Sequence, residues 1–213
     1  MSQATSGGDK TSRERARGSR REEICEAALD LAAAGGNHAV THHAIDDRLG
    51  IARGSTSYYY RTRQALLTAA ITHLTGLSRH AFLATFEEAD TSLDVDRAAD
   101  LSARQLDLLL GPRRRDALAR YALTADAAND DGLRSALARC LFSVPGAEAL
   151  MAHLDATDPS CAAHNFIILL EGLLFDRLHG SRSGLVIAPG SAASIADLRR
   201  PIRLWLTALQ HGD

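Results

Sequence analysis

Residues 40–67, "VTHHAIDDRLGIARGSTSYYYRTRQALL", decide the fold that we predict for this chain. Thr41 is a strong N-cap residue, Ile45 opens an apolar helix face, and Gly50 ends that helix in a conformation that costs glycine little. A second helix follows over about residues 52–60 and is rich in Gly, Ser and Thr. Two helices joined by a tight turn, the second one short, are typical of a helix-turn-helix.

Helical patterns continue on both sides of this stretch. The preceding segment carries apolar residues at i, i+3, i+4 and i+7 and ends at two glycines, Gly35 and Gly36. We therefore expect three short helices over about residues 20–60. After them, Thr62 is expected to cap a longer helix with apolar residues in register from Leu67 to Ala81. The apolar positions of the first helix are Ile24, Ala27, Ala28 and Leu31.

The remaining sequence also predicts helices and contains no convincing strand, so the fold class is all-α. A helix over about 160–178 is apolar almost all round, and a last helix over about 192–210 has a coiled-coil-like seam. We expect these two helices to form a two-fold, four-helix dimer interface. The other helices are expected over 95–110, 113–129, 132–142 and from Pro145. The seam positions are Ile195, Leu198, Ile202, Trp205 and Leu209.

Composition describes a globular protein. The 213 residues are 46% hydrophobic and 23% charged, and no apolar run approaches the ~20 residues that a membrane span needs. The N-terminus has no apolar core of the kind that a signal peptide carries. Three widely spaced cysteines indicate reduced thiols. These features favour a cytoplasmic protein with no membrane partner.

Charge is distributed unevenly along the chain. The net charge is −2, yet residues 1–21 hold six basic and two acidic side chains. A basic end on an acidic body indicates contact with a polyanion, and such an end can also be a solvated tail. We expect a flexible basic arm over 1–18, followed by a three-helix domain over 19–62 and a further helical domain over 63–213.

Side-chain chemistry around the second helix suits DNA. Arg53 can donate to both O6 and N7 of a guanine, and small residues such as Ser55 and Ser57 let the backbone approach the bases. Thr41, with His42 and His43, offers donors at a helix N-terminus, where the dipole favours a phosphate. The two arginines beyond the tyrosines, Arg61 and Arg63, suit phosphate contacts.

Residues 20–67 resemble the DNA-binding domain of the TetR (tetracycline-repressor) family. The family pattern runs from an Ile-x-x-Ala-Ala-x-x-Leu helix, through a glycine turn and a Thr-capped helix, to an aromatic run and a basic-x-x-Leu motif. Its later parts are present here as Gly36, Thr41, Ile45, Leu49, Gly50, Ile51, Gly54, Tyr58 to Tyr60, Arg63, Ala65 and Leu66.

The resemblance implies a homodimeric repressor that binds double-stranded operator DNA and is released when its C-terminal core binds a small molecule. It makes residues 19–62 a helix-turn-helix DNA-binding domain and residues 63–213 a helical ligand-binding and dimerisation domain. It implies no catalytic residue, no metal and no cofactor. Together with the residue types it assigns ten DNA-binding residues: Thr41, His42, His43, Arg53, Ser55, Thr56, Ser57, Tyr58, Tyr59 and Arg63.

Two positions depart from the family pattern. Ser57 stands where the family often has a tyrosine that contacts phosphate, so that contact is lost or passes to a neighbouring tyrosine. Asp46 replaces a small buried alanine, and it must either turn outward or find a partner, because burying a lone carboxylate is costly. In the family register Tyr60 packs into the core, Tyr59 faces the phosphates, and Tyr58 lies between them.

The sequence says least about the effector pocket. Apolar residues of the central helices are candidates for its lining, with a few polar side chains as anchors, and a hydrophobic small molecule fits such a lining. The candidates are Phe82, Phe86, Leu106, Tyr121, Phe142, His164, Phe166 and Leu170.

Other classes of function stay open. Cys161 and His164 are spaced to share a helix face, as in a metal sensor, although no second pair completes a zinc site. The alternative is a helical dimer that senses a metal or ligand and binds DNA weakly or not at all, which Ser57 and Asp46 would allow. No hydrolase, phosphate-loop or dinucleotide motif is present, so we expect no enzyme.

Overall fold

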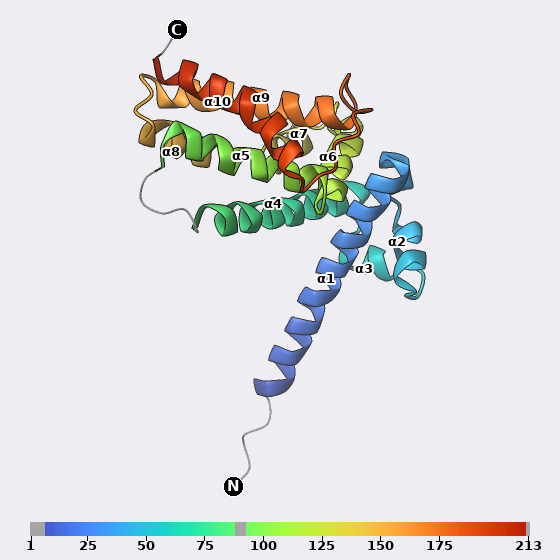
Figure 1. Cartoon of the computed structure of the whole chain (residues 1–213). Coiled ribbons are helices and arrows are strands. Elements are labelled where there is room, and N and C mark those ends of the chain that lie inside the picture. Colours follow the sequence, from blue (N-terminus) through green and yellow to red (C-terminus); the bar gives the residue numbers. More distant parts are fainter. Residues whose placement is uncertain (1–6, 88–92, 212–213) are drawn as a thin grey trace. The chain divides into compact units, whose positions relative to one another are not determined.

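The computed structural model describes residues 7–87 and 93–211, and in these ranges the chain is helical with no strand. Figure 1 shows the elements in chain order. They are α1 (Gly7–Gly35), a 3-10 turn η1 (Asn37–Ala39), α2 (His42–Leu49), α3 (Ser55–Tyr59), α4 (Arg63–Glu87), α5 (Val95–Leu110), α6 (Arg114–Ala127), α7 (Asp131–Ala138), α8 (Val144–His153), α9 (Pro159–Leu178) and α10 (Ala192–His211). The all-α prediction is confirmed.

The chain divides into two compact units. The first contains α1 to α3, α4 as far as His73, and residues 119–136. The second contains the rest of α4, residues 95–118, and α8 to α10. Three helices, α4, α6 and α7, therefore contribute residues to both units.

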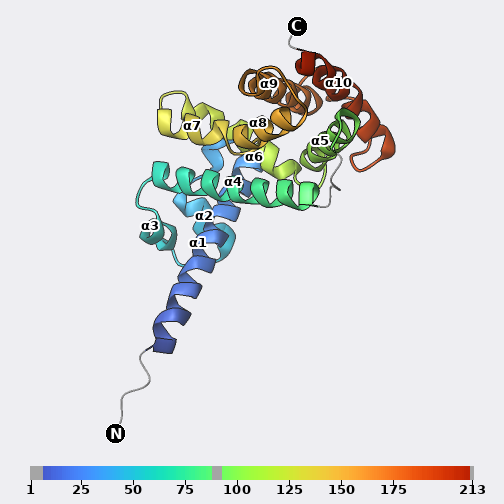
Figure 2. The same ribbon diagram turned by 90° about the vertical axis from the view of Figure 1, so that its left-hand side faces the viewer.

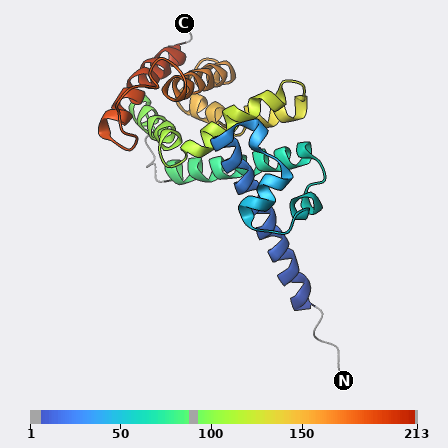
Figure 3. The ribbon, with the colours of Figure 1, turned by 90° about the vertical axis from the view of Figure 1, so that its right-hand side faces the viewer.

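The first unit is built around a small apolar core. Its helices α1 and α2 pack on one another, as do α2 and α3, and Figure 3 shows the pale blue α2 beside the dark blue α1. Branched side chains fill this core without measurable exposure, which supplies most of the free energy that holds such short helices in place. These side chains are Ile24, Leu29, Val40, Ile45 and Leu66.

The first helix is longer than the sequence predicted. We expected a flexible arm over residues 1–18, but α1 begins at Gly7. Lys, Arg and Glu are good helix formers, and adding turns to an existing helix costs far less than starting one. Residues 1–6 lie outside the described residues.

The second unit is a bundle in which α5 packs against α10, and α9 packs against both α8 and α10. Figure 2 shows α9 and α10 side by side. The inner stripe of α10 is Leu198, Ile202 and Leu206, all fully buried. Of the predicted seam positions, Leu198 and Ile202 lie in this inner stripe, whereas Trp205 is exposed. The role of the seam in a dimer stays a prediction. No helix in the described ranges is long and apolar enough to cross a membrane.

Candidate nucleic-acid interface

The α2–α3 corner is set by local backbone chemistry. The Thr41 hydroxyl accepts a hydrogen bond from the Ala44 amide at 3.1 Å, which confirms it as the N-cap of α2. Gly50 ends α2 with φ of 61°, and Gly54 precedes α3 with φ of 89°. Both are left-handed values that other residues adopt only with strain, so the two glycines fix where the turn begins and ends.

Asp46 lies inside this corner with no exposed surface. One carboxylate oxygen accepts from the amide and the hydroxyl of Thr56, at 2.8 and 2.6 Å, and the other accepts from the Gly54 amide at 2.8 Å. Burial raises the pKa of this carboxyl, but the three hydrogen bonds outweigh burial and the pKa lies below its usual value. Of the two alternatives that the sequence left open, the structure shows the second: Asp46 is buried and has partners.

Several of the ten predicted DNA-binding residues lie on the outer surface of this corner. Thr41, His43, Arg53 and Ser57 are exposed, and Ser55 is half-buried with its hydroxyl donating to the Ala52 carbonyl at 2.5 Å. Thr56 is the exception, because its side chain is fully buried against Asp46. Because Thr56 has no exposed surface, we remove it from the set of DNA contacts.

The three tyrosines point in different directions. Tyr58 is 68% exposed and meets Tyr59 edge-to-face, with ring centroids 5.3 Å apart. Arg17 of α1 donates to the Tyr58 hydroxyl at 2.6 Å, so the N-terminal part of α1 is tied to α3. Tyr60 is half-buried with its hydroxyl 3.6 Å from the Cys25 sulfur, and burial raises its pKa. Tyr60 therefore points inward, as expected, whereas Tyr58 is more exposed than the sequence suggested.

His42 and Arg63 are already bonded inside the first unit. The His42 ring nitrogen Nε2 lies 2.7 Å from the Tyr60 carbonyl oxygen. The Arg63 guanidinium pairs with Asp126 of α6 and donates to the carbonyl of Asn37 at 2.7 Å. The side chains of His42 and Arg63 therefore link the ends of α2, α3 and α4. Each has this structural role in addition to any contact that it makes with a phosphate.

The Arg63–Asp126 pair gives a direct test of that structural role. Arg63→Ala and Asp126→Asn should each lower the free energy of unfolding by about 1–2 kcal/mol, because each leaves a half-buried charge with fewer partners. In a double-mutant cycle measured by urea unfolding, the two changes should be coupled. Arg134 and Asp131 form a comparable pair on the surface, with side chains 59% and 91% exposed, and serve as control. A coupling no larger than that of the control pair would contradict the prediction.

The predicted effector residues are not gathered around a cavity that we describe. Leu106, Phe166 and Leu170 are buried in the second unit, whereas His164 is exposed and its Nδ1 lies 2.8 Å from the Ser160 carbonyl. Phe82 and Phe142 are half-buried, Tyr121 belongs to the first unit, and the side chain of Phe86 lies outside the described residues. An open hollow of about 360 Å³, lined by Asp94, His153 and Gln210 among others, contains none of these eight residues. Their role as a ligand site stays a prediction.

Among the described residues no cluster of three or more His, Cys, Asp or Glu is placed to hold a metal. The Cys161–His164 pair shares the first turns of α9, where the Cys161 sulfur accepts instead from the Asn165 amide at 3.6 Å.

Comparison with known proteins decides the family. The sequence model for the C-terminal domain of tetracyclin repressor-like proteins matches residues 93–208, more than half of the chain. The chain belongs to this family. The matched residues lie outside residues 20–67, on which the resemblance rested, so two separate parts of the chain indicate the same family. It is a transcriptional regulator of the TetR family, and that prediction is confirmed.

Solved structures with the same fold align with about nine-tenths of this TetR-family chain. A transcriptional regulator from Rhodococcus sp. Rha1 is 20% identical, with a TM-score of 0.69 and coverage of 90% of this chain and 96% of the other. A member of the TetR family from Streptomyces coelicolor A3 is 24% identical, with a TM-score of 0.65 and coverage of 90% and 98%. The multidrug-binding protein EbrR, complexed with ethidium, is 22% identical, with a TM-score of 0.63 and coverage of 90% and 98%. No curated protein is significantly similar in sequence.

Proposed function

We propose that this regulator is a cytoplasmic, homodimeric repressor that binds operator DNA through α2 and α3 and is released by a small molecule. The observation that carries the DNA-binding part is the outer surface of the α2–α3 corner. There Arg53 is exposed one residue before the N-cap of α3, and the hydroxyl-bearing residues Thr41, Ser57 and Tyr58 of the same corner are exposed too. A guanidinium at that place can read a base edge while the hydroxyls contact the phosphate backbone.

A dimer through α9 and α10 would place two such corners on one duplex. Four large apolar side chains are exposed on these two helices: Ile168, Phe175, Leu204 and Trp205. Exposed apolar side chains of this size gathered on one helix pair mark an interaction surface. A two-fold axis would pair the same surface of both subunits and match a palindromic operator.

The effector is proposed to be a small organic molecule bound in the helical domain. The likeness to EbrR, which was solved with ethidium, supports this class of ligand. Because α4 and α6 contribute to both compact units, a ligand that favours one arrangement of these helices would change the DNA affinity by its difference in affinity for the two states.

Selection of duplexes from a random library tests the DNA-binding proposal. We expect the wild-type protein to enrich a palindrome with half-sites one helical turn or a multiple apart. Binding of that palindrome, followed by fluorescence anisotropy, should weaken steeply with salt, because phosphate contacts release counterions. Failure to enrich any sequence at low salt would contradict the proposal and would favour the alternative of a sensing dimer that has lost DNA binding.

A further inference from the structure

The short helix α3 depends on its surroundings for its position. It has five residues, its N-cap Gly54 offers no side-chain cap, and a helix of this length does not form on its own. Its first amide, that of Ser55, donates to the Ala52 carbonyl at 3.0 Å, and the amides on either side of it, those of Gly54 and Thr56, donate to a residue of α2. The Asp46 carboxylate, which belongs to α2, holds the Gly54 and Thr56 amides and the Thr56 hydroxyl at 2.6–2.8 Å.

We propose that Asp46 is a positioning residue for DNA reading: it fixes α3 and the adjacent Arg53 relative to α2 without touching DNA itself. The proposal rests on the proposed function, since it assumes that α3 and Arg53 read a duplex. Asp46 has no exposed surface, so it cannot meet a base or a phosphate directly. It acts through Gly54, whose amide it holds and which directly follows Arg53 in the chain.

The geometry uses both oxygens of the carboxylate, which makes the site specific for aspartate. An asparagine at position 46 keeps one acceptor oxygen, and its amide group would face at least one donor among the Gly54 and Thr56 groups. That donor would be buried without a partner, and the corner must shift to relieve it. A shift at Gly54 moves the backbone of Arg53, where bidentate contact with a guanine tolerates little error.

A purely structural role for Asp46 predicts a different result. If the loss of its hydrogen bonds only lowered the fraction of folded protein, binding to every DNA sequence would fall by the same factor. If the loss misplaces α3, binding to the selected palindrome falls while binding to unrelated DNA, which depends on phosphate contacts, is kept. The ratio of the two affinities therefore separates positioning from stability.

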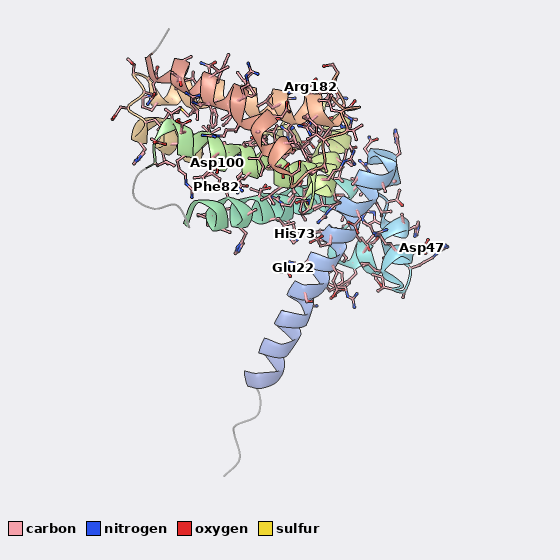
Figure 4. All side chains as sticks on the ribbon, in the orientation of Figure 1. Glu22, Asp47, His73, Phe82, Asp100 and Arg182 are labelled. Atoms are coloured by element: carbon pink, nitrogen blue, oxygen red, sulfur yellow. The ribbon has the colours of Figure 1, made fainter. Side chains whose placement is uncertain are left out.

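The experiment compares Asp46→Asn and Thr56→Val with the matched control Asp47→Asn. Asp47 is the next residue of α2, it is exposed, and Figure 4 shows it on the outer side of the corner. Its replacement removes the same charge without touching α3. Anisotropy is measured on the full chain with the palindrome selected by the wild type and with a scrambled duplex of equal length.

We expect the ratio of specific to non-specific affinity to fall about ten-fold or more in Asp46→Asn and Thr56→Val, and to stay at the wild-type value in Asp47→Asn. Thr56→Ser, which keeps the hydroxyl, should restore the ratio. An unchanged ratio in Asp46→Asn and Thr56→Val would overturn the inference, as would an equal fall in Asp47→Asn. A wild-type protein that selects no palindrome would instead overturn the proposed function, so the two failures are distinguishable.

Discussion

Leu204→Glu should produce a monomer and lower the affinity for the operator by roughly 10²- to 10⁴-fold, the range in which linking two binding modules raises avidity. The Leu204 side chain is 67% exposed on α10, next to the exposed Trp205, and Ile168 of α9 is 66% exposed. In a two-fold interface this surface meets its own copy, so one substitution places two carboxylates in an apolar contact. Sedimentation velocity would report the mass of the species, and anisotropy its affinity for the palindrome.

A leucine outside this surface provides the control for Leu204→Glu. Leu83 of α4 is 40% exposed, and Leu83→Glu adds the same charge to the same residue type. We expect this variant to remain a dimer with wild-type affinity. A Leu204→Glu protein that sediments as a dimer and binds normally would exclude α9 and α10 as the interface.

Arg53→Ala should cause the second large loss of affinity for DNA. Loss of a bidentate contact to guanine should lower the affinity for the selected palindrome by about ten- to a hundred-fold and relax the preference at one base pair of each half-site. Binding to scrambled DNA should change little, since that binding depends on phosphates. Repeating the duplex selection with the variant would show which base pair has lost its preference.

Arg61→Ala tests the difference between a contact with a base and a contact with a phosphate. Arg61 is exposed just after the tyrosines, where we expect a phosphate contact. Its loss should weaken binding to both duplexes equally and reduce the salt slope by about one. If Arg53→Ala behaved in the same way, Arg53 would be a phosphate contact and the base-reading role would be wrong.

Features encoded by neighbouring residues could be predicted from the sequence. Thr41 and Thr62 cap their helices as expected, with hydrogen bonds of 3.1 Å to Ala44 and Ala65, and Gly50 ends α2. Each of these depends on residues within one helical turn, so their spacing is sufficient. The helix over 95–110 was also predicted at its observed bounds.

Features that depend on residues far apart in the chain could not be predicted from the sequence. The partner of Asp46 is ten residues away, and whether Thr56 faces inward depends on where a five-residue helix begins. Arg63 looked like a free cation because its partner, Asp126, is 63 residues further along the chain. An effector pocket draws on several helices at once, and apolar spacing alone does not separate its lining from ordinary core.

The buried Asp46–Thr56 pair also limits how the recognition corner can evolve. Replacing Asp46 leaves the Thr56 hydroxyl and the backbone amides of Gly54 and Thr56 without their acceptor, and no second substitution at position 56 removes those two amides. Descendants of this regulator should therefore retain Asp46 together with a hydroxyl at position 56. Changes in operator preference would accumulate at the exposed positions, such as Arg53 and Ser57, where a substitution does not disturb the carboxylate beneath them.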